Sequence, residues 1–327
     1  MKVLLRKALL SGLVGLLIMI GLGGFFSKAQ AASGFYVSGT QLYDSTGKPF
    51  VMRGVNYAHS WHKDQFYTAI PAIAQTGANT VRIVLSNGNV YQKDNINKVE
   101  EIISLVTSYK MIPVLEVHDT TGKDDYASLD AAVNYWISIK DALIGKEDRV
   151  IVNIANEWHG TWNGSNWAEG YKQAIPKLRS AGIKNTLIVD CAGWGQYPQS
   201  IPDFGQSVFA ADYLKNTVFS IHMYEFAGKD AQTVRSNIDS VLNKGLPLII
   251  GEFGGYHKGA DVDETEIMRY GQSKGIGWLA WSWHGNSSEF SYLNLATGPN
   301  GNLTDWGRTV VEGTNGIKET SQKAGIF

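Results

Sequence analysis

Two glutamates stand where an apolar chain segment gives no reason for a charge. Glu157 ends the run 150-VIVNIANE-157, and Glu252 lies near the end of 247-PLIIGEF-253. A carboxylate at the end of a buried strand is costly unless a partner or a function holds it there. Two carboxyl groups that face each other can hydrolyse glycosidic bonds when one holds a proton and the other is ionised. If one of them attacks as a nucleophile, we expect the two groups about 5–5.5 Å apart.

The other apolar runs of the chain also end in polar or aromatic side chains. The positive charge of Arg82 can keep one of the two carboxylates ionised, and Tyr224 can donate a hydrogen bond to the same group. His222 and Tyr224 are two residues apart, so they face the same side of an extended chain. The side chains expected at the strand ends are Asn56, Tyr57, His59, Arg82, His118, Asp119, Asn156, Glu157, Trp194, His222, Tyr224, Glu252, Trp281 and Trp283.

A metal-dependent hydrolase is the rival chemistry from a different class. Its possible ligands are His118, Asp119, His222 and Glu252, but the sequence contains no H-x-H or H-E-x-x-H pair. We therefore expect no metal and no cofactor. A sugar-binding barrel without activity would keep the tryptophans and lose a carboxylate, and both carboxylates remain.

Eight apolar runs alternate with helix-like stretches along the chain. Such alternation indicates a parallel sheet, and eight units in about 250 residues fit a single α/β domain with a (β/α)8 TIM barrel. An open doubly wound sheet is the alternative, but no glycine-rich phosphate fingerprint follows the first run. An N-terminal β-hairpin is expected between QLYD and PFVM, with its turn at 45–48. The runs span 51–57, 79–85, 112–118, 150–157, 186–194, 217–224, 247–253 and 275–283.

Helical spacing is clearest at 93–110 and 127–146. Glycines stand where helices should stop, as expected of C-terminal caps. These are Gly77, Gly145, Gly182, Gly245 and Gly275.

The N-terminal segment 1–31 has the layout of a secretory signal peptide. Lys2, Arg6 and Lys7 precede an apolar run that ends in the small-residue motif Ala29-Gln30-Ala31. We expect cleavage, a catalytic domain over 32–327 and a secreted, extracellular protein; an uncleaved membrane anchor is the alternative.

The composition favours a neutral partner. The chain has 327 residues with 29 Lys+Arg and 30 Asp+Glu, which argues against nucleic acid and anionic membranes as partners. Its 10 tryptophans suit a long neutral polysaccharide, because indole faces stack on sugar rings. We expect Trp61, Trp158, Trp162, Trp194, Trp281 and Trp283 on the catalytic side. The single Cys191 cannot form an intrachain disulfide, and we expect a monomer without a membrane contact after cleavage.

The ordered strand ends resemble those of glycoside hydrolase family 5, a clan A family of retaining enzymes. The matching stretches are TVRIVL, EVHD, IANEW, SIHMYEF, IGEFG and LAWSW. Within the family the chain is similar to secreted Bacillus endo-β-1,4-mannanases, through ALIGKED, AGWGQYPQSI and GWLAWSW. The resemblance implies hydrolysis of internal bonds in mannan, glucomannan and galactomannan by double displacement. A cellulase of the same family remains the nearer alternative.

The same resemblance implies roles for individual residues. Glu157 would be the general acid/base and Glu252 the nucleophile. Asn156 would bind the substrate 2-hydroxyl, while Arg82 and Tyr224 would hold Glu252. The remaining positions would line the substrate site: His118, Trp194, His222 and, as the sugar platform, Trp281.

Overall fold

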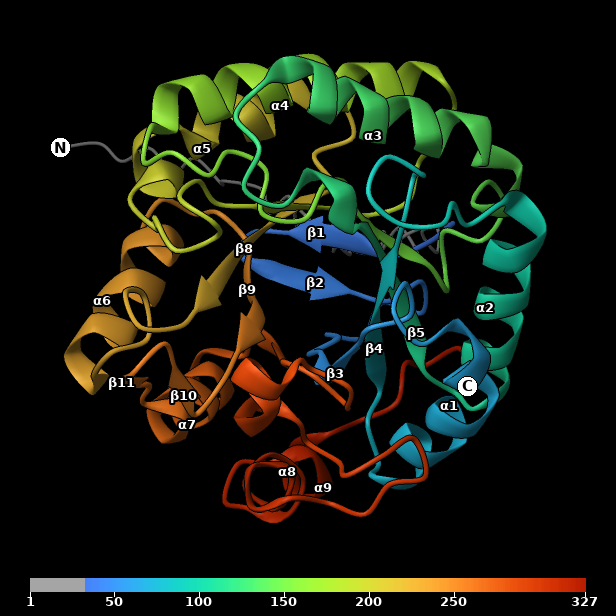
Figure 1. Ribbon diagram of the computed structural model, residues 1–327. Helices are drawn as coiled ribbons and strands as arrows, with labels where there is room; N and C mark the ends of the chain where they lie inside the picture. The colour runs from blue at the N-terminus through green and yellow to red at the C-terminus, as the bar shows by residue number, and fades with distance from the viewer. Residues whose placement is uncertain (1–32) are drawn as a thin grey trace, which may run out of the picture. The chain divides into compact units, whose positions relative to one another are not determined.

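The computed structural model describes residues 33–327, which form a closed parallel barrel surrounded by helices (Figure 1). The barrel strands follow one another in the order β12-β3-β4-β5-β6-β7-β8-β9. Their bounds are β3 Arg53–Tyr57, β4 Thr80–Leu85, β5 Ile112–Val117, β6 Ile151–Asn153, β7 Leu187–Asp190, β8 Thr217–Met223, β9 Leu248–Phe253 and β12 Gly277–Ala280. The predicted (β/α)8 barrel is confirmed. The proposed signal peptide, 1–31, and Ala32 lie outside the described residues.

The helices run between the strands and pack their apolar faces on the barrel. The main core lies between the two layers and includes the fully buried Trp136, Trp167 and Trp278. The helices are α1 Phe66–Gln75, α2 Ile96–Ser108, α3 Tyr126–Ser138, α4 Gly164–Ser180, α5 Ser200–Ala211, α6 Ala231–Leu242, α7 Glu264–Lys274, α8 Asp305–Glu312 and α9 Ile317–Thr320.

The helix ends agree with the glycine pattern. All five glycines expected at helix ends have positive φ, from 66° at Gly275 to 93° at Gly182, a region that favours glycine. The helix predicted over 127–146 is shorter in the structure, where α3 ends at Ser138. Ile139 leaves helical geometry (φ −114°), and a 3₁₀ turn at Lys140–Ala142 follows.

An N-terminal hairpin covers one end of the barrel, although its strands differ from those predicted. β1 Tyr36–Ser38 pairs with β2 Gln41–Tyr43, and the expected turn at 45–48 leads only to an isolated bridge between Tyr43 and Pro49. Leu42, Phe35 and Phe50 pack on inward-facing strand residues such as Val114 and Ile188. In Figure 1 the hairpin lies across the middle of the ring of helices. The opposite end, where the strands terminate, is left for the site.

Several observed strands end before the polar residues that were predicted at their ends. β6 stops at Asn153, so Asn156 and Glu157 belong to the following loop, and β7 stops at Asp190, before Trp194. Glu157 has φ 46° and Trp194 has φ 58°, a left-handed conformation that is costly for residues with a Cβ.

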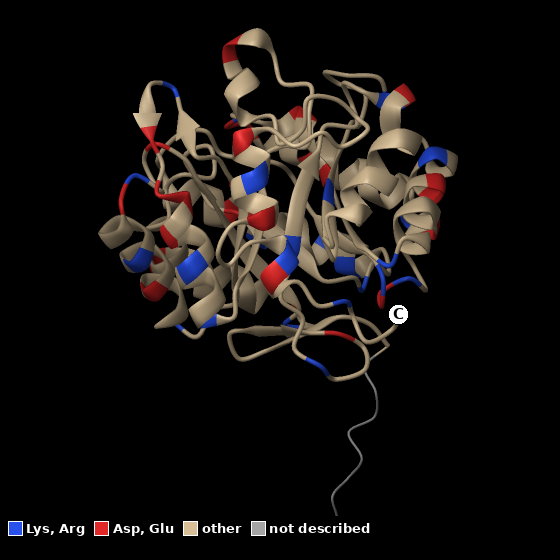
Figure 2. Ribbon diagram, turned by 90° about the horizontal axis from the view of Figure 1, so that it is seen from below, with Lys and Arg blue, Asp and Glu red and all other residues tan. Residues whose placement is uncertain are grey.

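Charges are spread over the fold. Figure 2 shows Lys and Arg interspersed with Asp and Glu around the ribbons, in agreement with the net charge of −1. Within residues 33–327, no helix has the length and apolarity needed to cross a bilayer.

Candidate active site

A cleft of about 790 Å³ opens at the carboxyl ends of the barrel strands. Glu157 and Glu252 both line it, together with aromatic side chains from several loops. The residues around the cleft include Trp61, His62, His118, Glu157, Trp162, Trp194, Gln196, Tyr224, Glu225, Phe226, Glu252, His257, Trp281, Asn286 and Phe290.

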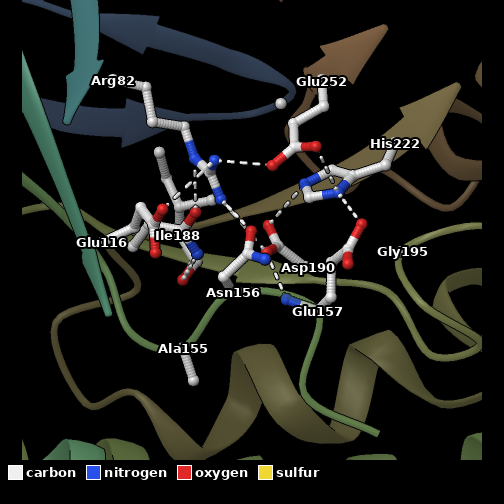
Figure 3. Close-up of polar contacts among 12 residues, drawn as sticks. Arg82, Glu116, Ala155, Asn156, Glu157, Ile188, Asp190, Gly195, His222 and Glu252 are labelled. Atoms are coloured by element: carbon white, nitrogen blue, oxygen red, sulfur yellow. Dashed lines mark hydrogen bonds and ion pairs between the residues drawn. The ribbon is translucent and has the colours of Figure 1, made fainter. Parts of the chain in front are cut away.

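The two glutamates approach each other in the cleft (Figure 3). One carboxylate oxygen of Glu157 and one of Glu252 lie within 4.8 Å of each other. This spacing suits the retaining arrangement, in which the groups are about 5–5.5 Å apart, and is too short for the ~6.5–9.5 Å of inverting enzymes.

An irregularity in the barrel aims Glu252 into the site. In the β8–β9 ladder Ile221 pairs with Ile250, whereas His222 pairs with Glu252, so Gly251 is an extra residue on β9. Bulges of this kind re-aim the side chains that follow them. The result is that His222 and Glu252 stand opposite each other.

Both oxygens of Glu252 accept hydrogen bonds from the residues predicted to hold it. Arg82 Nη1 donates to Oε1 at 2.8 Å, and Tyr224 Oη donates to Oε2 at 2.9 Å. Burial raises the pKa of Glu252 above its usual value, while the charges of His222 and Arg82 act in the opposite direction and that of Glu157 adds to the rise. The sequence indicated the two contacts and not this effect of burial.

Arg82 is itself held by a ring of side-chain amides. It donates to Asn56 Oδ1 at 2.9 Å, Asn153 Oδ1 at 2.9 Å and Asn156 Oδ1 at 2.6 Å. The amide nitrogen of Asn156 donates to Thr121 Oγ1, so this buried residue supports Arg82. Its expected bond to a substrate hydroxyl stays a prediction.

His222 connects the two glutamates. Its Nδ1 lies 2.8 Å from Glu157 Oε1 and 3.6 Å from Glu252 Oε2. Burial alone would lower the pKa of His222, but the charges of Glu252 and Asp190 prevail and raise it to about 10. The shift in pKa favours a protonated His222 between the carboxylates, whereas sequence reasoning had placed His222 only as a residue that lines the site.

Two buried carboxylates behind the site were missed as site residues. Asp190 lies in TLIVDCAGW and Glu116 in IPVLEVH, each a charge inside an apolar strand. That same signal singled out Glu157 and Glu252, so it could have found these residues too. Glu116 Oε1 lies 2.8 Å from His118 Nδ1, and Asp190 lies next to His222.

The predicted aromatic positions divide into two groups. Trp281 stacks on His118 with ring centroids 5.8 Å apart, and Trp61, Trp162 and Trp194 line the cleft with exposed indole faces.

Trp158 and Trp283 were also expected to face the cleft, and this was wrong because both are fully buried. Trp158 packs so tightly on α4 that a Cβ at Gly170 would fall 2.1 Å from its ring.

The atoms of Glu157, His222 and Glu252 are close enough to one another to suggest a metal site. Their partners do not fit one. Both oxygens of Glu252 already accept hydrogen bonds from Arg82 and Tyr224, and the positive charge of Arg82, 2.8 Å from Glu252, opposes a second cation there. The donor set fits a hydrogen-bonded network of charges.

Comparison with known proteins agrees with this geometry. The sequence profile described as "Cellulase (glycosyl hydrolase family 5)" matches residues 43–287. The chain is 60% identical to a mannan endo-1,4-beta-mannosidase of Salipaludibacillus agaradhaerens over 90% of this chain and 96% of that protein. It is 45% identical to a mannan endo-1,4-beta-mannosidase of Cellvibrio japonicus (98% and 74% covered).

A solved structure extends the comparison. The β-mannanase of Thermomonospora fusca superimposes with a TM-score of 0.86 at 41% identity, covering 90% of this chain and 99% of that one. The same enzyme in complex with mannohexaose gives a TM-score of 0.85 at 40% identity, with the same coverage.

Proposed function

The chain belongs to glycosyl hydrolase family 5, and from this premise we propose that Glu157 and Glu252 carry out its chemistry. The protein is a retaining endo-β-1,4-mannanase, which cleaves mannan chains internally. The observation that carries the residue assignment is the approach of the two carboxylates within 4.8 Å at the floor of an open aromatic cleft.

In the first step Glu252 attacks the anomeric carbon while Glu157 gives its proton to the leaving glycosidic oxygen. A covalent bond forms between Glu252 and the sugar, and the bond to the leaving chain breaks. Arg82 and Tyr224 direct both Glu252 oxygens, so the attacking oxygen needs little reorganisation.

In the second step a water molecule attacks the same carbon and Glu157 accepts its proton. Glu252 then leaves as a carboxylate, and two inversions restore the original configuration. His222 contacts both glutamates and can compensate charge as it moves from one to the other.

The open aromatic cleft supports binding of a long neutral chain. Trp281 beside His118 provides a platform next to the reacting carboxylates, while Trp61 and Trp162 extend the apolar surface along the cleft. We assign Trp194 to the same surface. We infer that glucomannan and galactomannan are also substrates, and that 1–31 directs secretion and is removed.

A reducing-sugar assay on a panel of mannan, glucomannan, galactomannan and carboxymethylcellulose tests the substrate class. We expect strong release from the mannan-type polymers and little from carboxymethylcellulose. Comparable rates on carboxymethylcellulose would favour the cellulase alternative, and loss of activity with a chelator would favour the metal-dependent one.

A further inference from the structure

Asp190 is a buried charge that the two steps above do not use. It is the last residue of β7, and no part of it reaches solvent. Its Oδ2 accepts the backbone N–H of Glu157 at 3.0 Å, and its Oδ1 lies 3.5 Å from His222 Nε2. A carboxylate taken out of water is costly unless its partners compensate. These two partners are Glu157, the candidate acid/base, and His222, which contacts Glu157.

The imidazole of His222 lies between Asp190 on one side and the two cleft glutamates on the other (Figure 3). Nε2 faces Asp190, and Nδ1 faces Glu157. The 3.5 Å contact between Nε2 and Asp190 Oδ1 is an ion-pair contact and not a hydrogen bond, so Asp190 acts on the ring through its negative charge, which favours the form with two protons. Removing the negative charge of Asp190 should therefore lower the pKa of His222 and favour the ring with one proton.

The orientation of the ring is fixed by two glycines. A Cβ at Gly195 would fall 2.7 Å from His222 Cγ, and one at Gly251 would fall 3.1 Å from Nε2. The backbone N–H of His222 also donates to Gly195 O at 2.7 Å. The ring therefore has little room to turn, and its Nε2 stays directed at Asp190.

We propose that Asp190 is a positioning residue that keeps His222 doubly protonated and holds the Glu157 backbone in its left-handed conformation. Through these two contacts it directs the Glu157 carboxyl toward the glycosidic oxygen. The inference rests on the proposed function, in which Glu157 is the acid/base. Asp190 does not line the cleft, so it acts only through its neighbours.

Several other ionisable groups surround this pair and bear on its charge. Arg82 Nη2 lies 3.6 Å from Asp190 Oδ2, and its positive charge favours the carboxylate form. The pKa of Asp190 is lowered to about 2, because the charges of His222 and Arg82 outweigh burial. The groups that face the pair are Arg82 from β4, Glu157 from the loop after β6, Tyr171 from α4, Cys191 after β7, Tyr224 after β8 and Glu252 from β9.

The test is the protonation state of His222, measured by NMR of ¹⁵N-histidine-labelled protein. In the wild type we expect a doubly protonated ring at pH 7. In Asp190→Asn the pKa of His222 should fall by about 1–3 pH units, the effect of losing a neighbouring opposite charge. Glu116→Gln is the matched control, because it also removes a buried negative charge beside Arg82, while Glu116 pairs with His118. It should leave the His222 titration close to that of the wild type.

Kinetics provide a second readout. Asp190→Asn should reduce kcat/KM on mannan at least about tenfold more than kcat/KM on a dinitrophenyl β-mannobioside, because kcat/KM reports the first step and this leaving group needs no proton from Glu157. A purely structural role would reduce both equally.

An unshifted His222 titration in Asp190→Asn, or equal losses on both substrates, would overturn the proposal. If that variant does not fold, a singly protonated His222 in the wild type at pH 7 would overturn it. None of these results bears on the assignment of Glu252 as the nucleophile, which the Glu252→Ala variant tests.

Discussion

Replacing Tyr224 with phenylalanine removes one defined hydrogen bond from Glu252 and leaves the other hydrogen bonds around Glu252 and Arg82 in place. Tyr224 Oη donates to Glu252 Oε2 at 2.9 Å in a buried setting, while Arg82 keeps its bond to Oε1. Burial, reinforced by the charge of Glu252, raises the pKa of Tyr224 well above its usual value, so the phenol remains a donor.

The size of the effect follows from the charge on the acceptor. A hydrogen bond to a charged group contributes about 1.5–3 kcal/mol. Because the bond favours the ionised form of Glu252, its loss raises the pKa of that group, by about 1–2 units at 1.36 kcal/mol per unit. At a pH on the acidic limb, kcat/KM of Tyr224→Phe should fall about 10–150-fold.

The assay is the pH dependence of kcat/KM on soluble mannan. The acidic limb should move to higher pH by about 1–2 units in Tyr224→Phe. Tyr135→Phe is the control: its hydroxyl donates to Asp94 O at 2.9 Å in the protein interior, away from the cleft. The control should lose some stability and keep the wild-type limb. An unmoved limb in Tyr224→Phe would refute the view that this bond helps to keep Glu252 ionised.

Other predictions test the roles, the stability and the processing of the protein. Glu252→Ala should lose turnover, and azide should restore it by forming the glycosyl azide of opposite configuration; no rescue would count against the nucleophile role. Glu157→Ala should retain activity on substrates with good leaving groups, and equal loss on all substrates would contradict its role as acid. Asp212→Asn should lower the free energy of unfolding by about 3–5 kcal/mol, because it leaves the fully buried Arg179 without its carboxylate; urea denaturation checks this, and a loss below about 1 kcal/mol would argue against it. N-terminal sequencing of secreted protein should start near Ala32, and protein beginning at Met1 would contradict cleavage.

The sequence by itself determined the barrel and the identity of the facing carboxylates. Parallel strands buried on both faces are apolar throughout, so their alternation with helical segments is visible in one dimension. A charge at the end of such a run is equally visible, which is why Glu157 and Glu252 could be named. Arg82 and Tyr224 followed, because the carboxyl ends of parallel strands meet on one side of the barrel.

Tertiary structure alone decided how these groups influence one another. The bulge at Gly251 brings Glu252 opposite His222, and no local pattern indicates the register of two strands that are distant in sequence. The burial of Trp158 depends on the absence of a side chain at Gly170 in a helix that packs over it. The pKa of His222 depends on three carboxylates from three different segments, because electrostatic interactions act through space and depend on distance and burial.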